Sequence, residues 1–294
     1  MKAKNHQTQK TGKLKIGDDW NAITIIALSQ SNPLKAVAEF VENSIDAKAK
    51  NITIIRGREK GYHYLKIKDD GQGIPLDKEG HPDFQYVATH ICDSIKRQLK
   101  SHGTKGLQGE FGIGLLSFWT LGEDLHVTST GKDGQSYQMQ MSKGNPSYKI
   151  TKKNVLLAGP GTELWIHHIL PGIKQFSGEK IQWYLSSELR DRIRHSGVQI
   201  RVIDRTARSE YKVEPRQFDG RPLYHLGKDA NKATDLYLEI YLTNYAPENH
   251  IGLYRNGTRL LENISELEQL NKPTWSSGHL QGIIEIPYLN LTPG

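Results

Sequence analysis

A largely apolar helical segment that keeps one polar face is the feature that most constrains the fold of this chain. Apolar residues recur at helical spacing and predict a helix over about residues 33–48. At 100° per residue, Glu39, Asn43 and Asp46 lie within roughly 60° of one another. The remaining surface of the helix carries Leu34, Val37, Phe40, Val41 and Ile45. Such a helix must be packed against other elements, which leaves its polar strip available for chemistry.

The spacing within this polar strip points to a particular chemistry. Glu39 precedes Asn43 by about one helical turn. An amide oxygen suits a hard cation, and a neighbouring carboxylate can take a proton from water. The pair therefore predicts a site for a metal ion and a water molecule, with Asn43 as the metal ligand. An ordinary solvated helix face is the alternative interpretation at this point.

A second motif, Asp69-Asp-Gly-Gln-Gly-Ile74, follows a predicted strand over residues 62–68. Gly71 and Gly73 permit positive φ angles and a close approach of the backbone to a flat ligand. The Asp69 carboxylate can accept a hydrogen bond from an exocyclic amine such as adenine N6. A plain β-turn would have a similar composition, so the motif alone does not establish a nucleotide site.

A third motif places Gly109, Gly112 and Gly114 at the start of an apolar stretch over residues 111–121, for which we expect a buried helix. Backbone N–H groups exposed at a helix N-terminus attract phosphate oxygens. The chain contains no G-x-x-x-x-G-K-[ST] sequence, which excludes a Walker A loop. Close helix packing is the alternative reason for these glycines.

Taken in order, and followed by Gly161-Thr162 before another predicted strand, these motifs resemble the four motifs of the GHKL (Bergerat-fold) ATPases. The sequence AEFVENSIDA over residues 38–47 is most similar to the branch that contains MutL, MORC proteins and type IIB topoisomerase B subunits. The resemblance covers about residues 20–204. It implies ATP and Mg²⁺ as cofactors and ATP hydrolysis as the activity.

The resemblance also implies a role for each matching position. Glu39 would be the general base for the attacking water, and Asn43 would be the magnesium ligand. Asp69 would recognise adenine, with Thr162 supporting the base. The other nucleotide-binding positions that it implies are Asp46, Gly71, Gly73, Ile74, Lys105, Gly109, Gly112 and Gly114. Residues 85–108 would form a lid over ATP, with Lys105 as a phosphate contact, and Asp46 would contribute directly or by positioning its neighbours.

The expected fold is α+β, with helices covering one face of a mixed, largely antiparallel sheet in a two-layer ATP-binding sandwich. We expect a flexible basic arm over residues 1–19, an ATPase domain over residues 20–206 and an incomplete transducer-like domain over residues 207–294. This last domain is expected to be a smaller α/β unit, because a strand, the sequence Arg255-Asn-Gly-Thr258, a short helix and a further strand follow one another there. The resemblance also implies a transducer lysine that reaches the γ-phosphate of ATP on dimer closure. No lysine follows Lys272, so either Lys272 fills this role or the chain ends before the lysine that does.

The remaining elements are predicted from periodicity and from turn residues. A helix is expected over residues 180–194, with Ser177 as its cap and Gly197 as its stop. Residues 205–235 are expected to connect the two domains. The other expected strands cover residues 51–57, 126–130, 136–141, 162–167, 198–203, 236–242, 251–261 and 280–287.

Composition limits the setting and the partners. The single cysteine, Cys92, excludes an internal disulfide and favours a reducing, cytoplasmic setting. The longest apolar stretch, around residues 22–28, is far too short to span a membrane, and we expect a soluble protein without a membrane partner. The formal charge of +7 is compatible with an anionic partner such as nucleotide or DNA, and equally with an excess of solvated lysines.

These expectations combine into two hypotheses of function. In the first, ATP closes the lid and promotes formation of a homodimer that acts as a clamp on DNA, and hydrolysis through Glu39 resets it. In the second, the same ATPase domain drives an Hsp-type chaperone that remodels proteins. A histidine kinase is disfavoured because Glu39 suits the activation of water.

Overall fold

The structure is a computed structural model that describes Thr24 and residues 32–88, 114–153, 159–173, 176–223 and 236–286. The expected arm over residues 1–19 lies outside the described residues, as does most of the expected lid. The described part of the chain forms an eight-stranded sheet and a five-stranded sheet, with helices packed against them. None of the described helices is long and apolar enough to cross a membrane.

Helix α2, Pro33–Asp46, begins and ends close to the predicted limits. Asn32 caps it by accepting a hydrogen bond from the Leu34 backbone N–H at 3.0 Å, and Pro33 occupies the first turn, where its missing N–H is not needed. The residues on its buried face are Ala36, Val37, Ala38, Phe40, Val41, Ser44 and Ile45. The apolar pattern therefore packs against the sheet, as its spacing predicted.

The larger sheet has the strand order β5-β4-β3-β6-β2-β1-β7-β8. Its strands are β1 (Asn51–Glu59), β2 (Tyr62–Asp69), β3 (Gly122–Thr130), β4 (Ser136–Ser142), β5 (Tyr148–Lys153), β6 (Thr162–Ile169), β7 (Gln199–Asp204) and β8 (Ser209–Val213). Every neighbouring pair in this order is antiparallel except β1 and β7. The ends of β2 and β6 lie side by side, with Lys68 opposite Glu163. This register brings Asp69 close to Thr162.

Two features of this sheet differ from the sequence-based expectation. Strand β8 pairs with β7, with Ile200 opposite Val213, so the first sheet extends past the boundary expected after residue 206. Residues 205–208 are the tight turn of a hairpin, and their polar composition reflects that turn instead of a link between domains. Strand β5 was not predicted, because it is an edge strand with mostly exposed side chains, and only Tyr148 and Ile150 in it are apolar.

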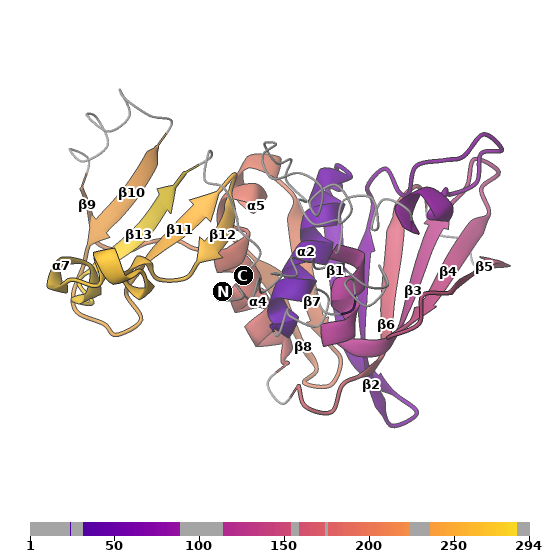
Figure 1. The fold of residues 1–294 in the computed structure, drawn as a ribbon, viewed down its shortest axis with the longest axis horizontal. Helices are drawn as coiled ribbons and strands as arrows, with labels where there is room; N and C mark the ends of the chain where they lie inside the picture. The colour runs from indigo at the N-terminus through magenta and orange to yellow at the C-terminus, as the bar shows by residue number, and fades with distance from the viewer. Residues whose placement is uncertain are drawn as a thin grey trace, which may run out of the picture.

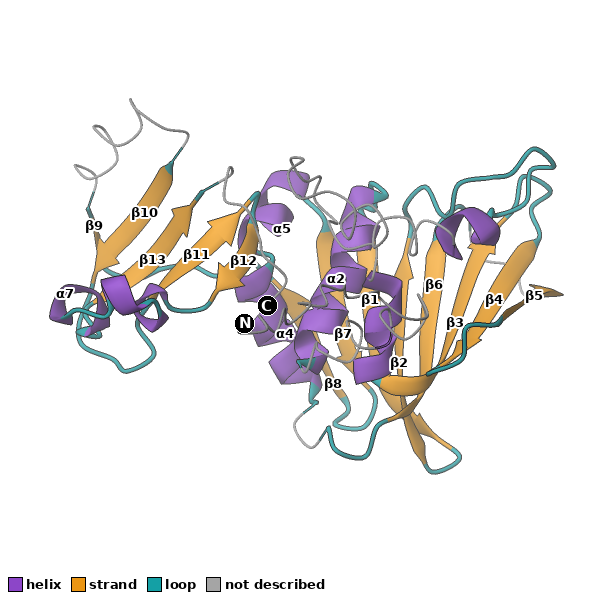
Figure 2. Cartoon of the chain, viewed as in Figure 1, coloured by secondary structure: helices purple, strands orange, loops and turns teal. Residues whose placement is uncertain are grey.

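The helices cover one face of the larger sheet, and the α+β fold is confirmed (Figures 1 and 2). The predicted helix over residues 180–194 is two helices, α4 (Gly178–Glu188) and α5 (Arg190–Ser196), which meet at Leu189. Ser177 caps α4, and Gly197 ends α5 with φ at +66°. The apolar stretch after Gly114 is the 3-10 helix η1 (Gly114–Thr120).

The second sheet has the order β12-β11-β13-β10-β9. Its strands are β9 (Arg221–Pro222), β10 (Tyr237–Leu242), β11 (Ile251–Arg255), β12 (Thr258–Leu261) and β13 (Leu280–Glu285). The short helices η2 (Ile264–Glu266), η3 (Glu268–Leu270) and α7 (Pro273–Ser276) accompany it. The single strand expected over residues 251–261 is a hairpin, because Asn256 and Gly257 turn the chain with φ angles of +49° and +81°.

Helices α4 and α5 lie between the two sheets (Figure 1). Buried charged groups join the second sheet to these helices. The Arg259 guanidinium contacts the Glu188 carboxylate at 3.0 Å, and both side chains are at most 6% exposed. Arg190 of α5 donates to Glu239 of β10 at 2.8 Å, and this guanidinium is also buried. Removing one partner from such a buried pair costs several kcal/mol, so these contacts connect the second sheet firmly to α4 and α5.

Candidate functional site

The polar strip of α2 faces the start of η1. Glu39 is half-buried and its Oε2 atom is shielded from solvent, whereas the Asn43 side chain is exposed. A Cβ atom added to Gly114 would lie 3.6 Å from Asn43 Nδ2 and 3.9 Å from Glu39 Oε2. The structure thus brings the first and third motifs into contact, although they are far apart in the sequence.

Asp69 lies at the junction of α2, β2 and β6. Its Oδ1 atom accepts hydrogen bonds from the backbone N–H groups of Gly71 at 2.9 Å and Thr162 at 3.2 Å. Its Oδ2 atom accepts from the Ser44 hydroxyl of α2 at 2.9 Å. Burial raises the pKa of the Asp69 carboxyl above its usual range, and hydrogen bonds from Gly71, Ser44 and Thr162 oppose that shift. The second and fourth motifs therefore meet at one carboxylate.

The glycines of the second motif allow this close packing. A Cβ atom on Gly71 would lie 2.8 Å from the Ala47 carbonyl oxygen, at the end of α2. Gly73 has φ at +73°, and a Cβ atom there would lie 2.8 Å from the Ser129 hydroxyl. Side chains at these two positions would push the loop away from α2 and β3. The loop after Asp69 can follow its observed path only with glycines there.

Ser129 connects the second motif to the fourth. Its hydroxyl accepts from the Ile74 backbone N–H at 3.1 Å and donates to the Gly161 carbonyl at 3.0 Å. Gly161 itself has φ at +146°, and a Cβ atom there would lie 2.2 Å from the Asp69 carbonyl oxygen. Sequence reasoning missed Ser129 and the part that Ser44 plays, because a serine at the end of a strand or inside a helix carries no distinguishing pattern.

Some of the site residues predicted from the sequence lie outside the described residues, and one has a different partner from the one expected. Lys105, Gly109 and Gly112 lie outside the described residues, so their predicted phosphate contacts stay predictions. Asp46 is on the expected face of α2, but its carboxylate forms an ion pair with Arg192 of α5. The structure therefore places Asp46 at the contact between the two helices, which agrees with the alternative that it positions its neighbours.

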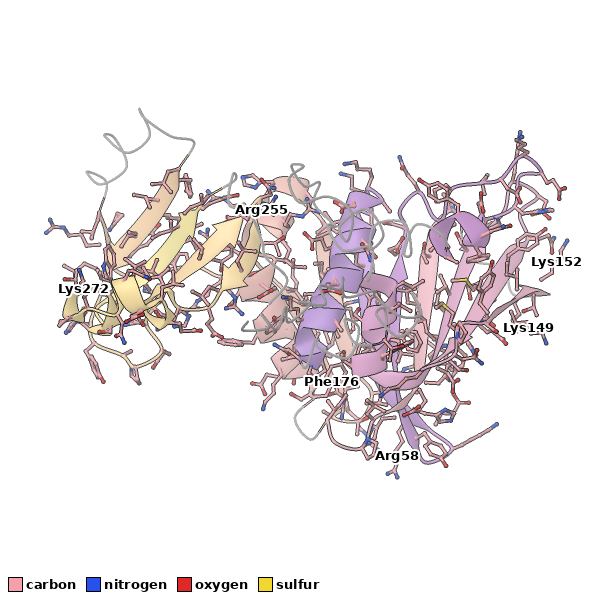
Figure 3. All side chains as sticks on the ribbon, in the orientation of Figure 1. Arg58, Lys149, Lys152, Phe176, Arg255 and Lys272 are labelled. Carbon is pink, nitrogen blue, oxygen red and sulfur yellow. The ribbon has the colours of Figure 1, made fainter. Side chains whose placement is uncertain are left out.

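Lys272 lies at the far end of the second sheet from α2 (Figure 3). It directly precedes the short helix α7 and is well separated from Glu39 and Asn43, which α2 carries. Within one chain, Lys272 is therefore not part of the site formed by Glu39, Asn43 and Gly114. The role of Lys272 as the transducer lysine that reaches ATP stays a prediction.

The residues present are compatible with ATP and a hard cation. Gly114 leaves open space beside Glu39 and Asn43, which a side chain there would partly fill. Asn43 presents an exposed amide next to a shielded carboxylate oxygen. Among the described residues, no group of three or more His, Cys, Asp or Glu is placed to hold a metal ion. The Asn43 amide beside the Glu39 carboxylate is a donor pair that suits Mg²⁺, because this ion uses few protein ligands and retains waters or phosphate oxygens.

The fold and this site define a nucleotide-binding sandwich, and comparison with known proteins agrees. Residues 31–157 match the family described as histidine kinase-, DNA gyrase B- and HSP90-like ATPase. This part of the chain is therefore similar to the ATPase domain of the GHKL family that the motifs pointed to.

Relatives of this domain include bacterial proteins named DNA mismatch repair protein MutL. The MutL of Limosilactobacillus fermentum is 31% identical over 134 residues, which is 46% of this chain and 19% of the relative. The MutL of Clostridium botulinum (strain Kyoto) is 46% identical over 79 residues, which is 26% of this chain and 11% of the relative. These matches confirm the resemblance to the MutL branch. The chain covers only a small part of either relative.

Proposed function

We propose that this chain binds ATP together with Mg²⁺ and hydrolyses it, and that this cycle controls dimerisation on DNA. The observation that carries the proposal is the convergence of Glu39, Asn43 and Gly114 at one end of the site, with Asp69 held at the junction of α2, β2 and β6. Helix α2 carries Glu39, whose carboxylate is suited to water activation. The same helix carries Ser44, which binds the Asp69 carboxylate suited to adenine recognition.

Each of these residues would have the role that its side chain or backbone suits. Asp69 would accept a hydrogen bond from the exocyclic amine of adenine through Oδ2, because Oδ1 already accepts from two backbone N–H groups. Gly71, Gly73 and Ile74 would shape the pocket for the base, with Thr162 beside it. Asn43 would hold the cation, which supplies neutralisation of phosphate charge. Glu39 would orient a water molecule and take its proton.

Removal of the divalent cation gives the first test. With ATP and Mg²⁺ we expect phosphate release and a shift from monomer to dimer by light scattering. With excess EDTA we expect both to fall to background, because the phosphate charge is then not neutralised. AMP with Mg²⁺ is the matched control, since it contains the adenine but lacks the β- and γ-phosphates. Phosphate release that is unchanged in EDTA would contradict the proposed role of Mg²⁺.

DNA is the proposed partner of the closed dimer. The relatives carry a name that assigns them to DNA mismatch repair, and the chain has a formal charge of +7. Basic side chains are also exposed on the sheet that carries the site: Lys149 and Lys152 lie on its outer edge strand β5 (Figure 3). Lys152 also pairs with Asp133, so Lys149 is the stronger candidate of the two for a contact with a polyanion, which exposed basic groups favour by releasing counterions.

A salt series with duplex DNA tests this partner. We expect duplex DNA to stimulate ATP hydrolysis at 50 mM salt, and the apparent DNA affinity to fall by about tenfold or more by 200 mM, because phosphate contacts weaken as salt rises. Polyglutamate of similar charge serves as the control for a nonspecific polyanion and should not stimulate. No stimulation by DNA at low salt, together with stimulation by an unfolded polypeptide, would favour the chaperone hypothesis.

A further inference from the structure

The tip of the β11–β12 hairpin rests on the contact between α2 and α5. Asn256 and Gly257 form its two-residue turn. A Cβ atom on Gly257 would lie 3.1 Å from the backbone nitrogen of Arg192 and 3.2 Å from its Cγ atom. The turn therefore needs glycine both for its positive φ angle and for its close approach to α5.

The first residue after this turn reaches the helix that carries the site. Thr258 donates a hydrogen bond from its hydroxyl to Glu42 Oε1 at 2.7 Å. Glu42 lies on α2 directly before Asn43. The same carboxylate oxygen lies 3.5 Å from Arg192 Nε, and Arg192 also pairs with Asp46. Arg192 thus holds two carboxylates that are about one helical turn apart on α2.

This network is shielded from solvent where it joins the three elements. The side chains of Arg192 and Glu42 are 19% and 21% exposed, whereas that of Asp46 is 52% exposed. Partial burial strengthens the first pair, because water screens it less. Loss of the Thr258 hydroxyl would leave Glu42 with one fewer donor at a partly buried position, which is costly for a carboxylate.

The hairpin cannot shift freely against α4 and α5. Tyr254 of β11 donates its hydroxyl to the Ser187 carbonyl at 2.8 Å, and Arg259 of β12 pairs with buried Glu188. The Gly257 N–H donates to Glu285 of β13 at 2.9 Å, which ties the turn to the centre of the second sheet. A displacement of the second sheet would therefore reach α2 through the hairpin tip.

We propose that Thr258 and Arg192 are positioning residues, which set the placement of Glu39 and Asn43 by holding Glu42 and Asp46. The second sheet thereby contributes to the geometry of the ATP site from outside it. This inference rests on the proposed ATPase function. Neither residue need touch the nucleotide, so the expected defect lies in the turnover rate and not in ATP affinity.

Replacing Thr258 with valine tests the proposal with little change in shape. We expect Thr258→Val to lower kcat by about five- to tenfold while the ATP Kd stays within about twofold of the parent value. Thr258→Ser restores the hydroxyl and should recover most of the rate. Thr243→Val, in the loop after β10 of the same sheet, makes the same chemical change away from α2 and should leave both constants unchanged.

A double-mutant cycle separates coupling from general damage. Adding Thr258→Val to Glu42→Ala should cause no further loss of kcat, because the acceptor of the hydroxyl is already gone. Additive losses, equal effects of the valine changes at 258 and 243, or failure of Thr258→Ser to recover the rate would each overturn the proposal.

Hydrogen exchange keeps this test independent of hydrolysis. Thr258→Val should speed exchange of the backbone amides of residues 42–46, and Thr243→Val should not. A parent chain that hydrolyses no ATP would contradict the proposed function, and exchange at α2 would still decide whether the hairpin holds this helix. Unchanged exchange over residues 42–46 would overturn the inference even in an active ATPase.

Discussion

Glu39→Ala should abolish ATP hydrolysis while ATP binding persists. Glu39 has a shielded carboxylate oxygen near Asn43 and Gly114, which is where we propose that water is activated. Without a base the proton of the attacking water has no acceptor, and general base catalysis typically contributes about 10²- to 10⁴-fold in rate. We therefore expect kcat to fall by about that factor, measured as phosphate release, with the ATP Kd within about threefold of the parent value.

Glu39→Gln distinguishes the loss of a base from the loss of packing. Glutamine keeps the size of the side chain and its ability to form hydrogen bonds, but it cannot take the proton. It should be nearly as inactive as the alanine variant and should keep the parent melting temperature. Hydrolysis at the parent rate in either variant would show that another group is the base.

Asp69→Asn should weaken ATP binding by about 100-fold, which corresponds to about 2.7 kcal/mol. Oδ1 faces the N–H groups of Gly71 and Thr162, so the amide oxygen of the new side chain must take that position. The NH₂ group then occupies the position of Oδ2 and meets the adenine amine donor to donor. The Ser44 hydroxyl can reverse its role and accept, so the fold should tolerate the change.

The measurement is a titration with ATP at pH 7.5. Asp70→Asn is the matched control. The Asp70 carboxylate is exposed and accepts from the backbone N–H groups of Lys50 and Asn51, and we expect the ATP Kd to stay within about twofold of the parent value. Equal ATP affinity for Asp69→Asn and the parent chain would contradict the adenine assignment.

Much of the local structure could be predicted from the sequence. Helix α2 follows from apolar spacing, and β1, β2 and β6 follow from runs of β-branched and aromatic residues. The motifs pointed to Glu39, Asn43, Asp69 and Thr162, and the structure joins these positions in two adjoining clusters through Gly114 and Ser44. Local patterns could identify these residues because each lies within a few positions of a strong helix or strand signal.

Other features depended on contacts between distant segments. Strand β8 has no apolar alternation strong enough to assign it to the first sheet, and only its pairing with β7 does so. Ser129 became a site residue because β3 ends beside the loops that contain Ile74 and Gly161. Asp46 lies on the predicted polar face, yet Arg192 of another helix decides which way its carboxylate points.

The sequence by itself indicated the ATPase family that the chain resembles, the α+β fold and the residues proposed to act on ATP. It could do so because helical spacing and glycine-dependent turns are local properties. The tertiary structure alone decided which of these residues meet, and that the hairpin containing Thr258 reaches Glu42 on the helix that carries the site. Hydrogen bonds and ion pairs of this kind join positions that are far apart in the chain. Their partners are chosen by the packing of whole elements, which no local pattern specifies.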